Sequence, residues 1–436
     1  MKTSVVLALL ALAAARPRSR QVDQQQQVVT DGPQEQVVTE GPKPEGLPLG
    51  PADDLFEYRN PETTDFGDML FESDMVLTEE QRLNRQAASN LWTSPVSFAI
   101  SSSSAGDRAA ILAGIQHWRD HSCIEFDEVS EGSSTPHINF VKSSGCWSYI
   151  GQITSSGGQR ISIGNGCTSL GTVAHEIGHA MGLNHQQSRP DRDTYVQINF
   201  ENIKSGKEGN FRISSSSDNY SVPYDLTSVM HYGSTYFSSN GKDTIQVKNV
   251  LYEGLIGTRG GFSHRDKHII NAMYQCDDAC SSKPTCLNGG FVGKDCTCVC
   301  PHNTEGANCE SETEDYYGEL ACGDEDMTDE GTITSPNYPA NFPRNVVCFW
   351  VITAPENQQV ELSVTDMKML YRYGGSCPWD YLTVRHSGDI HYDDVKACDA
   401  ELTGQTFTSA GNKMVVKFKS GNYGWYRGFS AAVKFV

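Results

Sequence analysis

Residues 175–185 read HEIGHAMGLNH, and this segment is the strongest signal in the chain. His175 and His179 are four residues apart, so on a helix they share one face and can bind the same metal ion. Glu176 lies next to the first histidine, where a carboxylate can polarise a metal-bound water and accept its proton. The pattern therefore predicts a helix that carries a metal site and a general base. It could also be an exposed helix face that happens to hold these polar residues.

A glycine and a third histidine extend the pattern. Gly182 has the backbone freedom to end the helix, which allows His185 to return to the same ion. Three neutral nitrogens leave one position on zinc open, as in catalytic rather than structural zinc sites. The spacing HExxHxxGxxH, followed by SVMHY at residues 228–232, is typical of metzincin zinc proteases and disfavours three unrelated histidines.

Through HEIGHAMGLNHQQSRPDRD and the later SVMHY, the chain resembles the astacin-type metalloendopeptidases. The resemblance implies an α+β metzincin catalytic domain at residues 86–279. It also implies that Met230 forms a hydrophobic floor beneath the zinc, and that Tyr232 is a hinged additional zinc ligand that swings away to hydrogen-bond the transition state. From residue types alone, Met230 could fill an ordinary core and Tyr232 could be a buried tyrosine. His231, between them, is expected to be structural.

Composition places the chain outside the cell. The length of 436 residues predicts about two to four modules. A net charge of −20 disfavours nonspecific binding to nucleic acid or anionic membranes, and fourteen cysteines favour disulfides formed in an oxidising compartment. Lys2 and the apolar run at residues 5–14 predict a secretory signal at residues 1–15, which is too short to span a membrane. We therefore expect a secreted chain with no membrane span.

Residues 16–85 are expected to form a propeptide. Residues 16–52 are rich in Gln, Gly and Pro and predict a disordered segment. Residues 53–85 are acidic and contain LFESDMVLT, which resembles the astacin propeptide motif FxGD with Ser73 in place of the glycine. The resemblance implies that Asp74 occupies the zinc and keeps the enzyme latent, because an anion there blocks the position of the water. Asp74 could also be one acid in a solvated run.

Two arginines follow this motif. Arg82 and Arg85 have the spacing that a furin-like activating protease prefers, although isolated arginines are often plain surface residues. Cleavage after Arg85 or Gln86 is therefore the expected maturation step. In the family, the new amino terminus is buried against a glutamate directly after the third histidine. Gln186 holds that position here, so an amide hydrogen bond would have to replace the salt bridge.

Mixed helical and strand patterns in the catalytic domain predict its α+β fold. The predicted strands are residues 96–100, 137–142, 148–154 and 159–164, and the predicted helices are residues 107–119 and 172–181. Their buried faces are expected to hold Ile111, Leu112, Ile115 and Trp118 on the first helix, and Val173, Ile177, Ala180 and Met181 on the second.

The resemblance implies two disulfides in this domain, Cys123–Cys276 and Cys146–Cys167. The second flanks Cys-Trp-Ser-Tyr at residues 146–149, which matches the family's edge strand at the upper rim of the cleft. An extended substrate can pair with such a strand through its main chain. Trp147 and Tyr149 could then contact substrate side chains, or they could be ordinary strand aromatics.

Residues 280–310 contain six cysteines and resemble an EGF-like module, through Asn-Gly-Gly at residues 288–290 and a close Cys-Val-Cys. The resemblance implies the pairs Cys280–Cys296, Cys286–Cys298 and Cys300–Cys309. Six cysteines allow 15 connectivities, so this choice rests on the family. Closely spaced cysteines could instead bind zinc, but secretion disfavours free thiolates.

An acidic linker at residues 311–321 leads to residues 322–436, which resemble a CUB domain, an all-β sandwich. The resemblance rests on GTITSPNYP, CFW and WDYLTV, and it implies the disulfides Cys322–Cys348 and Cys377–Cys398.

Many CUB domains bind calcium through three acids. Only Asp380 is kept here, while Leu370 and Gly421 occupy the other two positions. Calcium needs several oxygen ligands, so no calcium site is expected in this domain.

These parts together predict a secreted zinc endopeptidase made as a latent zymogen. The architecture resembles tolloid-like and sea-urchin hatching or blastula proteases, which suggests matrix proteins, growth-factor precursors or egg envelope as substrates. Arg259 could favour acidic substrate side chains or be an ordinary loop residue, and Asn219 begins a glycosylation sequon. The CUB and EGF-like modules are expected to bind matrix partners. The alternative is a secreted binding or matrix-associated protein in which proteolysis is incidental.

Overall fold

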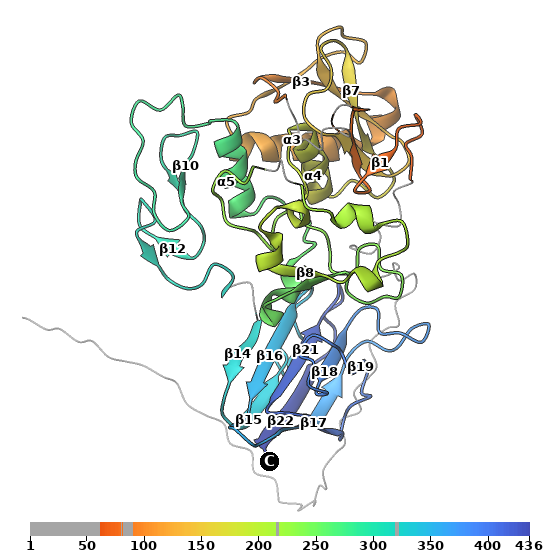
Figure 1. The fold of residues 1–436 in the computed structure, drawn as a ribbon, viewed down its shortest axis with the longest axis vertical. Helices are drawn as coiled ribbons and strands as arrows, with labels where there is room; N and C mark the ends of the chain where they lie inside the picture. Colours follow the sequence, from red (N-terminus) through yellow and green to blue (C-terminus); the bar gives the residue numbers. More distant parts are fainter. Residues whose placement is uncertain (1–61, 80, 82–89, 215–217, 319–321) are drawn as a thin grey trace, which may run out of the picture. The chain divides into compact units, whose positions relative to one another are not determined.

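The computed structural model describes residues 62–79, 81, 90–214, 218–318 and 322–436, all within one compact unit of the chain (Figure 1). The predicted signal, the segment at residues 16–52 and the proposed cleavage site at Arg85 lie outside the described residues. Within the described part, no helix has the length and apolar character that crossing a membrane requires.

The catalytic region contains a seven-stranded sheet in the order β1-β2-β6-β7-β5-β3-β4. Its strands are β1 (Leu70–Phe71), β2 (Met75–Val76), β3 (Val96–Ile100), β4 (Phe126–Glu128), β5 (His137–Val141), β6 (Cys146–Tyr149) and β7 (Gly158–Ile163). The central strands β4, β3, β5 and β7 run parallel, and β6 is antiparallel to β7. The hairpin of β1 and β2 comes from the predicted propeptide and extends the sheet beyond β6.

One predicted strand is wrong. Residues 148–154 do not form a continuous strand, because β6 ends at Tyr149. The chain leaves the sheet there to follow the active-site helix, where the Gly151 amide donates to the His179 carbonyl at 2.9 Å. The next amide, of Gln152, donates to the Asn90 carbonyl at 2.9 Å, so these backbone groups are satisfied outside the ladder.

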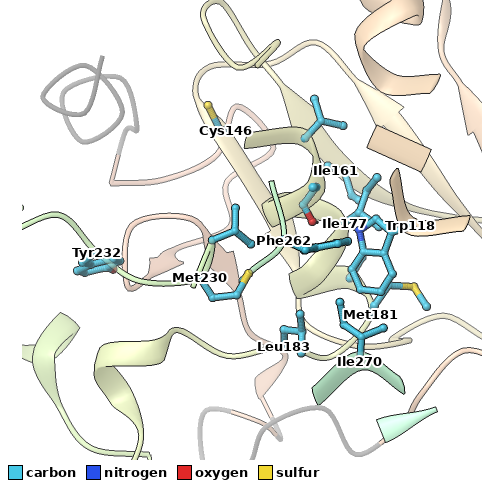
Figure 2. Close-up of a cluster of buried hydrophobic side chains, with 14 of the residues drawn as sticks. Trp118, Cys146, Ile161, Ile177, Met181, Leu183, Met230, Tyr232, Phe262 and Ile270 are labelled. Atoms are coloured by element: carbon cyan, nitrogen blue, oxygen red, sulfur yellow. Dashed lines mark hydrogen bonds between the residues drawn. The ribbon is translucent and has the colours of Figure 1, made fainter. Parts of the chain in front are cut away.

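Helices α3 (Arg108–His121) and α4 (Leu170–Ala180) pack on the sheet and on each other (Figure 1). The α4 helix begins two residues before the predicted start, and the Ser169 side chain caps it by accepting from the Thr172 amide. The apolar stripes of both helices enter one core, which Figure 2 shows around Trp118, Ile177 and Met181. Leu112 is only partly buried at its edge.

After α4 the chain is mostly irregular and runs through short 3-10 helices. These are η2 (Gln186–Ser188), η3 (Arg192–Thr194), η4 (Phe200–Asn202), η5 (Glu208–Phe211) and η6 (Val250–Leu255), in addition to η1 (Ser102–Asp107) before α3. Strands β8 (Val196–Ile198) and β9 (Ile245–Val247) pair antiparallel among them. Helix α5 (His264–Met273) then closes the domain and starts at a capping box formed by Ser263 and Asp266.

The cysteine-rich region holds two small hairpins, β10 (Phe291–Val292) with β11 (Cys298–Val299) and β12 (Thr304–Glu305) with β13 (Ser311–Glu312). Its disulfides are Cys280–Cys296, Cys286–Cys298 and Cys300–Cys309, the pairs that the EGF-like resemblance implies. The catalytic region has Cys123–Cys276 and Cys146–Cys167, again as the resemblance implies.

The C-terminal region is built from two sheets. One has the order β14-β16-β21-β18-β19 and the other β15-β22-β17-β20. The strands are β14 (Cys322–Met327), β15 (Gly331–Thr334), β16 (Val347–Thr353), β17 (Val360–Lys368), β18 (Tyr381–Arg385), β19 (Val395–Ala397), β20 (Thr406–Thr408), β21 (Lys413–Lys419) and β22 (Gly428–Phe435). A single apolar core includes residues from both sheets, as in a sandwich, and Cys322–Cys348 and Cys377–Cys398 are bonded.

Candidate metal centre

Three histidines converge beside α4. His175 and His179 lie one turn apart on the helix, and a left-handed Gly182 (φ 106°) turns the chain so that His185 reaches the same point. The Nε2 atoms of His175 and His179 are 3.1 Å apart, and all three rings are fully buried. Nitrogens that share a tetrahedral zinc at about 2.0–2.1 Å lie about 3.3 Å from each other, so this donor set fits zinc.

The other ring nitrogens hold the histidines in place. The Nδ1 atom of His175 is 2.8 Å from the Val229 carbonyl, and that of His179 is 2.8 Å from the Leu183 carbonyl. A carbonyl can only accept, so each Nδ1 carries the proton and each Nε2 lone pair faces the common point. Burial lowers the pKa of His175 to about 4, which favours the neutral ring that a metal requires.

A carboxylate from the predicted propeptide fills the fourth corner. Asp74 is fully buried, and its Oδ2 lies 3.2 Å from the Nε2 of both His175 and His185. Burial acts to raise the pKa of Asp74, but the charge of His185 and hydrogen bonds from the two rings outweigh it and lower that pKa. Asp74 and Glu72 correspondingly raise the pKa of His185 to about 9 against the effect of burial. A bound dication would supply the positive charge that this proton now supplies.

Glu176 lies in the same enclosed space without a hydrogen bond. Both of its side-chain oxygens are buried and have no hydrogen-bond partner among the described residues. Burial, reinforced by the negative charge of Asp74, raises the pKa of Glu176 well above its usual range. A buried carboxylate without a partner is costly, which is the arrangement expected of a proton-transferring group rather than a structural one.

Residues 228–232 form a turn next to α4, with Met230 and Tyr232 directed as Figure 2 shows. Met230 is buried, as the predicted hydrophobic floor requires. His231 is buried as well, and its Nε2 lies 2.7 Å from the Tyr224 hydroxyl, which agrees with a structural role. The Tyr232 hydroxyl donates to the Glu72 carbonyl, so its role as a zinc ligand stays a prediction.

Two residues that hold this site were not predicted. Asp266 accepts hydrogen bonds from the Ser228 hydroxyl at 2.6 Å and the Val229 amide at 2.9 Å, which fixes the start of the turn. Its position in the motif Ser-x-x-Asp before a helix was the available signal. Glu72 accepts from Ser188 at 2.9 Å and lies 2.7 Å from the Nδ1 of His185. Only its proximity to Asp74 in the sequence hinted at this contact.

The propeptide hairpin covers the predicted substrate strand. Strand β2 pairs parallel with β6, and the Ser148 amide donates to the Asp74 carbonyl at 2.8 Å. Trp147 is therefore not an exposed rim residue in this structure. It is fully buried, with Phe66 packed edge-on at 6.2 Å, and the Tyr149 hydroxyl donates to Asp68 at 2.9 Å.

The remaining predicted positions are more dispersed. Gln186 is buried, and its amide donates to the Met230 carbonyl at 3.0 Å, whereas the residues expected to form the mature amino terminus are outside the described part. Arg259 donates to the His231 carbonyl at 3.0 Å. Asn219 is partly exposed in a loop. Asp380 is buried in the C-terminal sandwich, where its Oδ1 accepts from the Gly421 amide at 2.7 Å.

Comparison with known proteins agrees with this geometry. The peptidase family described as "Astacin" matches residues 84–275, and the "CUB domain" family matches residues 322–433. The chain is 36% identical over 397 residues to Blastula protease 10 of Paracentrotus lividus, covering 84% of this chain and 65% of that protein. It is 35% identical to Protein SpAN of Strongylocentrotus purpuratus, covering 84% of this chain and 62% of that protein.

Among solved structures, the chain is 35% identical to High choriolytic enzyme 1, a hatching enzyme zinc-protease from Oryzias latipes. That match covers 43% of this chain and 95% of the other, with a TM-score of 0.40. The chain thus spans less than two thirds of the length of the two sea-urchin relatives. From the family matches, together with the histidine pattern that they share with the site above, this chain belongs to the astacin family of zinc metallopeptidases and carries a CUB domain.

Proposed function

We propose that this chain is a secreted zinc endopeptidase made as a latent zymogen, with one zinc held by His175, His179 and His185. The observation that carries the proposal is the buried, unpartnered Glu176 beside three converging Nε2 atoms. No structural requirement explains a carboxylate in that position, whereas peptide hydrolysis needs a base next to the metal-bound water.

When bound, zinc supplies a water of lowered pKa, about 7 in such sites, and polarises the scissile carbonyl. Glu176 accepts the proton of that water and then delivers it to the leaving amine, a double role that suits a carboxyl whose pKa is raised. Tyr232, once released from the Glu72 carbonyl, donates its hydroxyl to the developing oxyanion. Met230 closes the floor beneath the histidines and keeps water from their rear face.

Latency follows from the propeptide hairpin. Asp74 takes the place of the catalytic water, and β2 takes the place of substrate along β6. We propose that an activating protease cuts after Arg85, after which the hairpin leaves and β6 becomes an open edge that can pair with substrate. Trp147 and Tyr149 would then line the rim of the cleft.

The remaining assignments are part of the same proposal. The signal is residues 1–15, the propeptide 16–85, the protease 86–279, an EGF-like module 280–310, a linker 311–321 and the CUB domain 322–436. Substrates are extracellular proteins of matrix, growth-factor precursor or egg-envelope type in development or hatching, as the names of the relatives suggest. The CUB and EGF-like modules contact matrix partners, Asn219 carries a glycan, and the CUB domain binds no calcium.

The test is zinc-dependent proteolysis by the secreted, processed chain. We expect about one zinc per chain by metal analysis, digestion of casein, loss of digestion with a chelator, and recovery when zinc is returned. Uncleaved chain should contain zinc and stay inactive. A processed chain that takes up no zinc and digests nothing would instead support the alternative, an extracellular binding protein.

A further inference from the structure

A buried ion pair joins the catalytic region to the CUB domain. Glu253 of η6 is 8% exposed and accepts two hydrogen bonds from Arg385 of β18, at 2.9 and 2.8 Å. Arg385 is only 2% exposed. His391 lies 3.0 Å from the same carboxylate and Lys417 lies 3.8 Å from it. One carboxylate of the protease thus meets three basic side chains of the CUB domain in a dry environment.

Apolar contacts surround this ion pair. Val250 of η6 belongs to one buried cluster with Phe349 and Val415 of the CUB sheet. Partly buried side chains that pack against the cluster come from both sides, and they are Leu251, Val347, Val351 and Ile390. Because water is excluded from the contact, the ion pair is screened little by solvent.

The chain that follows η6 contacts the active-site turn. The Thr258 hydroxyl donates to the Thr227 carbonyl at 3.1 Å, and Arg259 donates to the His231 carbonyl at 3.0 Å. Gly257, in a left-handed conformation (φ 82°), lies so close to Gly233 that an added Cβ would be 2.6 Å from its Cα. Seven residues, 253–259, therefore connect the CUB contact to the turn that carries Met230 and Tyr232.

We infer that the CUB domain is a positioning partner of the catalytic site, acting through Glu253 and Arg385. By holding η6, the CUB domain fixes residues 256–259 against the turn and so keeps Tyr232 at the position from which it serves the reaction. This role differs from the partner recognition proposed above, and its effect on turnover rests on the proposed peptidase activity. Because the contact is intramolecular, it acts on every substrate, including one too short to touch the CUB domain.

The experiment compares variants of the full, processed chain on a short fluorogenic peptide. Arg385→Gln removes the pair, and we expect kcat to fall about 3- to 30-fold, the usual range for coupled sites, with KM and zinc content unchanged. Arg427→Gln is the matched control, because Arg427 makes a two-bond pair with Asp366 within the CUB domain, with both distances 2.6 Å. The control should leave kcat unchanged.

Hydrogen exchange gives a readout that does not depend on activity. Faster exchange of the amides of residues 229–233 is expected in Arg385→Gln and not in Arg427→Gln. If Arg385→Gln is not secreted, the milder His391→Ala decides in its place, with a smaller change in the same direction. Parent-level kcat and exchange in the variant used would overturn the inference. An inactive parent chain with slow exchange that becomes faster in the variant would defeat only the proposed function.

Discussion

Two buried glutamates of the catalytic region differ in every respect except burial. Glu176 has no hydrogen-bond partner among the described residues, and burial raises its pKa. Burial would raise the pKa of Glu253 as well, but hydrogen bonds from His391 and Arg385, together with the charge of Arg385, lower it. A paired carboxylate can hold two modules together because its charge is compensated. An unpaired one holds nothing, so it is free to exchange a proton.

The sharpest way to break this comparison is to remove the charge of Glu176. In the mature enzyme, Glu176→Gln should lower kcat/KM by about 10²- to 10⁴-fold, because the general base is lost while the shape is kept. Zinc content should not change. Urea unfolding should show equal or greater stability, since a buried charge without a partner has been removed. A fall in stability or in bound zinc would mean that Glu176 is a structural residue.

The opposite result is expected for Glu253. Glu253→Gln leaves Arg385 and Lys417 without their shared carboxylate, and breaking a buried pair in this way costs about 3–5 kcal/mol. Urea unfolding of the full chain measures the loss. Glu128→Gln is the control, because Glu128 also pairs with an arginine, Arg108, but both side chains are largely exposed. Equal losses in the two variants would remove the distinction between the two kinds of pair.

The pH dependence of stability sharpens the same contrast. Since the pKa of Glu253 is lower in the folded chain than its ordinary 4.5, its stabilising effect is complete above that pH and is lost as the pH falls through the lowered value. The difference in unfolding free energy between the parent and Glu253→Gln should therefore shrink on acidification below about pH 4.5. Urea titrations at several pH values measure it. A difference that is independent of pH would show that Glu253 acts by packing rather than by charge.

These two sites also differ in how far the sequence predicts them. The ligands His175 and His179 follow from spacing alone, because one helical turn fixes both, and Gly182 marks the return to His185. The pair between Glu253 and Arg385 joins residues 132 positions apart, and Glu72 meets His185 across 113. No local periodicity encodes such contacts.

Strand predictions failed for a similar reason. Alternation extended the strand at residues 148–154 past Tyr149, but the end of β6 is decided by hydrogen bonds to His179 and Asn90, which come from elsewhere in the chain. The α3 and α4 helices were predicted well because their apolar stripes pack on a core that any amphipathic helix of that period would face.

The smallest expected effect concerns the residue that replaces the family's glycine in the propeptide. Ser73 adopts a left-handed conformation (φ 68°) directly before Asp74, and this costs a residue with a Cβ about 1–2 kcal/mol. Ser73→Gly removes that strain but adds about 0.5–1 kcal/mol of unfolded-chain entropy. The net gain for the latent form should be about 0.5–1 kcal/mol.

Urea unfolding of the uncleaved chain measures this gain, and Ser73→Ala is the control because alanine keeps the Cβ and loses only the hydroxyl. A stabilised glycine variant with an unchanged alanine variant would show that backbone conformation limits how tightly the propeptide binds. The processed enzymes should be identical, since Ser73 leaves with the propeptide. Equal gains from both substitutions would instead assign the effect to the hydroxyl.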